Sequence, residues 1–82
     1  MVKVEVLEIR EDFPVRDEAY ALLRGDDGRY AFAWGPTYPY AEELPAENVK
    51  DGESGIEWYE TEYDARAAME QAASAWDGIR GN

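Results

Sequence analysis

The chain has 82 residues, of which nineteen are acidic and eight basic, so its formal net charge is −11. Cysteine and histidine are absent, which excludes a disulfide framework, thiolate metal sites and the commonest general base of enzymes. Three Trp, six Tyr and two Phe supply large apolar side chains for a compact core. We therefore expect residues 1–82 to form one acidic α+β domain.

The N-terminal residues alternate between valine and charged side chains, so Met1 is not followed by the continuous apolar core of a signal peptide. No apolar run approaches the roughly 20 residues that a membrane-spanning helix needs. The sequence predicts a cytoplasmic protein that does not enter a membrane.

Residues 2–10 predict a β-strand, because three alternate valines share one face at its start. Leu7 and Ile9 then occupy the opposite face. This change of parity predicts either a β-bulge near residues 6–7 or a strand end covered on both faces. Residues 11–17, which include a proline, are expected to form a loop.

Residues 18–24 and 29–34 predict a β-hairpin, because the Gly-Asp-Asp-Gly sequence of residues 25–28 tolerates the positive φ of a turn. One face of the hairpin carries bulky side chains and the other carries mostly alanines. The bulky set is Tyr20, Leu22, Tyr30, Phe32 and Trp34, and the alanines are Ala19, Ala21, Ala31 and Ala33.

Residues 35–55 contain three prolines, with Gly52 and Gly55 near the end, which predict a long loop with a short helical turn or strand near residues 42–49. Connections of this length are often functional. A short strand is expected at residues 56–59.

Residues 62–77 predict an α-helix. Thr61 is placed to cap its N-terminus, with Asp64 returning the bond, and Gly78 is suited to the left-handed position that ends a helix. The expected buried stripe is Ala65, Met69, Ala72, Trp76 and Ile79. The pairs Glu62–Arg66 and Arg66–Glu70 are expected on the opposite, solvent-facing side.

Together these elements predict a small antiparallel sheet of three to four strands, in the order β-β-β-(β)-α, with the C-terminal helix packed on its bulky face. Small helix residues against large sheet residues would fill that layer without voids. An SH3-like barrel with an appended helix is the alternative.

Catalysis is not expected. Ser54 lies in a glycine-rich turn without the strand and helix that surround a hydrolase nucleophile. The turn at residues 25–28 carries negative charge where a phosphate would bind. The acidic turns do not match the ligand spacing of a twelve-residue calcium-binding loop, so no metal or cofactor is expected.

Residues 42–64 hold nine acids and a single base, Lys50, with aromatic residues interleaved. Acids on a rigid surface can imitate the phosphates of a nucleic acid, and aromatic residues can anchor a complex. We therefore expect the partner to be a larger protein with a basic surface, without direct nucleic-acid binding. The candidate partner-binding residues are Tyr38, Tyr40, Glu42, Glu43, Glu47, Asp51, Glu53, Glu57, Trp58 and Glu60.

The overall profile, small, acidic, aromatic and without His or Cys, is similar to that of phage-encoded inhibitors, including DNA mimics and anti-CRISPR proteins. This resemblance covers composition alone and implies an inhibitor that binds its target protein. The alternative is a structural or accessory domain from a salt-adapted or mobile-element genome, whose acidity serves only solubility. In that reading the alanine face could form a homodimer, unless residues 35–55 cover it; monomer and homodimer both remain open.

Overall fold

A computed structural model describes residues 1–11, 19–51 and 54–80 of the chain, with side chains described as far as residue 75. Most of the loop predicted at residues 11–17 lies outside this range. The described elements are β1 (Val2–Arg10), β2 (Ala19–Gly25), β3 (Tyr30–Gly35), the 3-10 helix η1 (Tyr38–Tyr40), β4 (Glu43–Leu44), β5 (Val49–Asp51), β6 (Ser54–Tyr59) and α1 (Glu62–Arg80).

The six strands form one antiparallel sheet in the order β4-β1-β2-β3-β6-β5. The prediction of three to four strands is therefore wrong. The two additional strands, β4 and β5, have two and three residues and lie within the segment expected to be a long loop. β4 is held by a strand distant in sequence, because Leu44 pairs with Val2 of β1. β5 is held by the next strand in the chain, because Asp51 pairs with Ser54 of β6.

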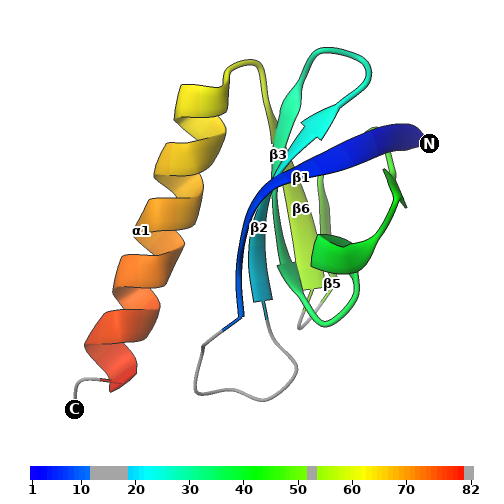
Figure 1. The fold of residues 1–82 in the computed structure, drawn as a ribbon. Helices are drawn as coiled ribbons and strands as arrows, with labels where there is room; N and C mark the ends of the chain where they lie inside the picture. Colours follow the sequence, from blue (N-terminus) through cyan, green and yellow to red (C-terminus); the bar gives the residue numbers. More distant parts are fainter. Residues whose placement is uncertain (12–18, 52–53, 81–82) are drawn as a thin grey trace.

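The sheet curls into a half-barrel (Figure 1). Its edge strands, β4 and β5, are joined by residues 45–48 alone. Six strands laid flat would place their edges about 24 Å apart, whereas the five peptide units from Leu44 to Val49 span at most about 18 Å. The sheet is curved, as the alternative prediction of an SH3-like barrel would require. It has six strands and one helix packed on one side.

The start of the chain confirms the predicted bulge. Val6 pairs with Leu23 of β2 and Glu8 pairs with Leu22, so Leu7 is the extra residue between them. The bulge turns Leu7 toward the face that carries the helix, while Ile9 returns to the other face. The hairpin of β2 and β3 is confirmed as well, with Gly28 at a φ of 89°.

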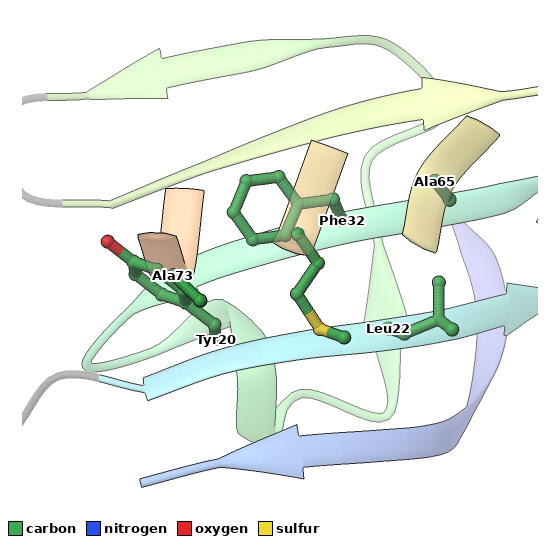
Figure 2. Close-up of a cluster of buried hydrophobic side chains, with 6 residues drawn as sticks. Tyr20, Leu22, Phe32, Ala65 and Ala73 are labelled. Carbon is green, nitrogen blue, oxygen red and sulfur yellow. The ribbon is translucent and has the colours of Figure 1, made fainter. Parts of the chain in front are cut away.

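The convex face of the sheet packs against α1. Tyr20, Leu22 and Phe32 project from the sheet toward Ala65 and Ala73 of the helix (Figure 2). Tyr20 and Phe32 meet edge to face with ring centroids 5.5 Å apart, an arrangement favoured by the quadrupoles of the rings. The expected packing of small helix residues on the bulky hairpin face is confirmed for the described side chains.

The concave face carries the alanines. Ala21, Ala31 and Ala33 are fully buried there, together with larger residues from neighbouring strands. The segment that contains η1 lies across this face on the side away from the helix, where Tyr38 packs on the cluster (Figure 1). Small residues suit the inside of a tight curl, since opposite walls approach closely. The alanine face is therefore covered by this chain and is not available as a dimer interface.

Helix α1 begins as predicted: the backbone N–H of Asp64 donates to the Thr61 hydroxyl at 3.1 Å. It continues to Arg80, so the predicted end at residue 77 is wrong. Ala65 and Met69 are buried as expected, whereas the side chains of Trp76 and Ile79 lie outside the described part. Arg66 bonds Glu62 at 3.1 Å but also reaches Glu8 of β1, and Glu70 binds Arg10. This side of the helix is therefore tied to β1 and is not simply solvent-facing.

Candidate protein-binding surface

Every arginine whose side chain is described makes an ion pair with a carboxylate. The pairs are Arg10 with Glu8 and Glu70, Arg24 with Glu5, Arg29 with Asp27, and Arg66 with Glu8 and Glu62. These pairs join β1 to the helix, join β1 to β2, and link the hairpin turn to the residue before β3. The fold therefore uses its arginines to neutralise one subset of its acids.

A second subset of acids follows the segment that closes the sheet. We call Glu42, Glu43, Glu47 and Asp51 the edge acids. All four are exposed, and within the described part of the chain they make no ion pair. Lys50 is the only basic residue among them. The edge acids thus form a stretch of exposed acids without ion pairs along residues 42–51, which we call the edge segment, although Lys3 lies opposite Glu43 in the register of β1 and β4.

Trp58 and Arg29 hold this segment against the sheet. The Trp58 indole Nε1–H donates to the carbonyl oxygen of Pro45 at 2.9 Å, and the Trp58 backbone N–H donates to Asn48 Oδ1 at 2.8 Å. The Arg29 guanidinium lies 4.4 Å from the centroid of the Trp58 ring and donates to the Ala46 carbonyl at 3.0 Å. Residues 45–48 are thereby held at Pro45, Ala46 and Asn48, which fixes the position of Glu47 between them.

Asp27 keeps Arg29 in that orientation. Its carboxylate accepts hydrogen bonds from the Arg29 backbone N–H at 3.1 Å and from Arg29 Nε at 2.8 Å. These hydrogen bonds, first the backbone one and then the side-chain one, hold the pKa of Asp27 below its usual value. The guanidinium of Arg29 therefore contacts the aromatic face of Trp58 and the carboxylate of Asp27 at the same time.

The ten candidate residues do not form a single surface. Tyr38 and Trp58 are half-buried and pack on the concave core. Tyr40 is 54% exposed and its hydroxyl donates to Glu11 at 2.5 Å. Glu60 is exposed in the turn before α1, and Glu53 lies outside the described residues.

Glu57 is on the convex face, because it pairs with Phe32 across β3 and β6. There it borders a pocket of about 200 Å³ at the edge of the helix–sheet contact. We call this the helix-edge pocket; it is lined by Tyr20, Phe32, Trp34, Lys50, Glu57 and Ala72. Sequence reasoning did not identify it, although alternation along residues 54–59 places Glu57 and Trp58 on opposite faces.

The aromatic wall of this pocket is fixed by close packing. The Trp34 ring lies directly over Gly55, where an added Cβ would come within 2.1 Å of the Trp34 Cζ2 atom. Trp34 and Phe32 are neighbours, with ring centroids 5.1 Å apart. Only glycine at position 55 allows the indole to approach the backbone this closely.

The carboxylate of the pocket is held by a tyrosine. The Tyr59 hydroxyl donates to Glu57 Oε1 at 2.8 Å. Burial of the ring, and secondarily this hydrogen bond to Glu57, raise the pKa of Tyr59 to about 12. Tyr59 is therefore a permanent donor near neutral pH, which orients the Glu57 carboxylate.

A larger hollow of about 280 Å³ lies beside the hairpin turn and is lined by residues of β1 and β2. Two of its charged side chains, Arg24 and Glu5, are paired with each other. Among the described residues there is no group of three or more acidic side chains placed to hold a metal ion. Within the same residues, the helix is not long and apolar enough to cross a membrane.

Comparison with protein-family models, curated proteins and solved structures finds no match to this chain. The functional argument therefore rests on the charges, contacts and pockets described above.

Proposed function

We propose that this protein is a non-enzymatic inhibitor that presents its edge acids to the basic groove of a nucleic-acid-binding protein and blocks that groove. The observation that supports this proposal most strongly is the separation of charge. The described arginines neutralise acids that hold the fold together, whereas the edge acids are exposed and, among the described residues, are not ion-paired. A groove that normally holds phosphates offers the complementary charge.

The rigidity of the edge segment supports the same proposal. Because Trp58 and Arg29 anchor residues 45–48, the edge acids are presented without a large loss of chain entropy on binding. Tyr40 is close to them in sequence and exposes an amphipathic ring, a type of residue that often anchors protein interfaces. Long-range attraction would raise the association rate, and Tyr40 would slow dissociation.

The test compares two double charge reversals of equal net charge. One variant, Glu42→Lys with Glu47→Lys, changes the edge segment; the other, Glu60→Lys with Asp64→Lys, changes exposed acids near the start of the helix. Each immobilised protein is exposed to nucleic-acid-binding proteins eluted from DNA-cellulose, at low salt, with and without competing duplex DNA. The association rate of any captured protein is then measured.

We expect wild type and the helix-side variant to capture the same protein, with capture prevented by DNA. The edge variant should associate at least about tenfold more slowly, since steering depends on local charge. Equal slowing by both variants, or capture that DNA does not affect, would remove the proposal of a nucleic-acid mimic.

A further inference from the structure

The helix-edge pocket combines an aromatic wall with a carboxylate. Tyr20, Phe32 and Trp34 supply the wall, and Glu57 supplies the charge at its border. Tyr59 occupies one oxygen of that carboxylate, Oε1, and within the described residues the other oxygen accepts no hydrogen bond. The second oxygen is thus oriented and available.

The size of the pocket limits its occupant. At about 200 Å³ it is smaller than the pockets that hold drug-sized ligands, which are on the order of 300–1,000 Å³. It suits one side chain or one small planar group. Ala72 on the helix side and Gly55 beneath Trp34 leave this space, because neither has a long side chain.

The same molecule shows which group an aromatic face and a carboxylate hold together. Arg29 lies over the Trp58 ring at 4.4 Å while its guanidinium is paired with Asp27 at 2.7 Å. A guanidinium is planar, stacks on aromatic rings and donates to carboxylates in a fixed geometry. Trp34 and Glu57 offer the same two groups from neighbouring strands, β3 and β6.

From this correspondence we infer that the helix-edge pocket binds an arginine side chain of the partner protein, stacked on Trp34 and paired with Glu57. The inference rests on the proposed function, because basic nucleic-acid-binding grooves are rich in arginine. Lys50 of β5 borders the pocket and belongs to the edge segment, so both contacts can be made by one partner. The edge acids would attract the basic groove, and the pocket would hold one of its side chains.

Lys50 distinguishes this occupant from an anionic one. Its ammonium is exposed and is not ion-paired within the described residues. It repels a guanidinium but would attract a carboxylate or phosphate. The net charge of −11 favours the cation. Lys50→Ala should therefore strengthen binding of an arginine probe, whereas it would weaken binding of an anion.

The test titrates the ¹⁵N-labelled full-length protein with the tripeptide acetyl-Gly-Arg-Gly-amide at low salt. A peptide with norleucine in place of arginine serves as the control probe. The NMR signals followed are the Trp34 indole N–H and the backbone amide of Gly55. Glu57→Gln is compared with Glu60→Gln, which removes one charge from an exposed position outside the pocket.

We expect the arginine peptide alone to shift the Trp34 signal. Glu57→Gln should weaken that binding about fivefold or more and Glu60→Gln less than about twofold, since only Glu57 can form the charge-assisted hydrogen bond. Equal effects of the two substitutions, no shift of Trp34, or weaker binding by Lys50→Ala would overturn the inference. If the probe fails while the edge variant still loses its partner, only the pocket is wrong; if the probe binds while edge reversal has no effect, only the proposed function fails.

Discussion

Trp58 joins the two borders of the sheet through both its ring and its backbone. It belongs to β6, yet it bonds Pro45 and Asn48 at either end of the link between β4 and β5. Arg29, from the hairpin, covers its ring. The Trp58 ring, the Trp58 backbone and Arg29 therefore hold residues 45–48 against the sheet together.

Trp58→Phe should lower the free energy of unfolding by about 1–2 kcal/mol. The substitution removes the indole donor to Pro45 and weakens the contact with Arg29, while an aromatic ring remains in the concave core. Urea denaturation with an unchanged slope would measure this loss. Tyr63→Phe, at a position that is 80% exposed, is the control and should change the midpoint little; equal stability of the Trp58 variant and wild type would argue against the anchoring role.

The α-helix is held to the sheet in two different ways. Its small residues pack on the convex core, and its charged side reaches β1 through Glu8, Arg10, Arg66 and Glu70. Arg66, and next Arg10, donate hydrogen bonds to Glu8 and hold the pKa of its carboxyl below its ordinary value. The apolar contact is independent of pH, whereas the ionic contact is not.

This difference predicts how acid affects the helix–strand contact. Because the folded-state pKa of Glu8 is depressed, the unfolded chain binds more protons between the two pKa values, and stability rises with pH there. The contribution of Glu8 is fully present above its unfolded pKa of about 4.3 and is lost as the pH falls through the folded-state pKa. Glu8→Gln should therefore be less stable than wild type at pH 7 and approach it in acid. Urea midpoints across that range measure the difference, and a difference that does not change with pH would contradict this account.

The start of the helix depends on Thr61. Its hydroxyl accepts a hydrogen bond from the backbone N–H of Asp64, one of the groups that a helix leaves unpaired. Thr61→Ala should lower the free energy of unfolding by about 1 kcal/mol, and Thr61→Ser should keep most of it. Thermal unfolding followed by circular dichroism compares the two; an equal loss in both variants would show that the hydroxyl is not the cause.

Elements whose turn residues and alternation of side chains lie close together in the chain could be predicted from the sequence. The hairpin was readable because the turn residues and the alternation around Tyr30 and Trp34 are adjacent in the chain. The bulge followed from the parity change at Leu7. A short helical turn or strand was expected near residues 42–49, where β4 lies, but the pairing of β4 with β1 and the strand β5 could not be predicted, because two or three residues show no alternation and their strand geometry comes from pairing.

The candidate site was predictable only in part. The acidity of residues 42–51 is plain in the sequence, but the separation of paired from unpaired acids is not. Glu8 and Arg66, for example, are 58 residues apart and meet only after the helix docks. Trp58 and Tyr38 were expected at a partner surface, and the curl of the sheet turns them toward the concave core.

At the scale of the whole molecule, the described acids include a set paired with arginine and a set of exposed acids without ion pairs, to which the edge acids belong. Acids paired with arginine connect strands and helix, so they contribute to the fold. The edge acids are exposed and repel one another, which costs stability at low salt. Cores on both faces of the sheet provide the apolar burial that tolerates this cost. We claim that the fold needs neither the edge acids nor high salt.

The most direct test is a thermal melt, followed by circular dichroism, of wild type and of the Glu42→Lys, Glu47→Lys variant across a wide range of KCl concentration. We predict a cooperative transition in low salt for both proteins, small changes as salt is added, and a variant that melts at or above the wild-type temperature because repulsion is relieved. A wild-type chain that is unfolded in low salt and rescued by KCl at molar concentration would contradict the claim. The acidity would then be an adaptation to a salt-rich environment.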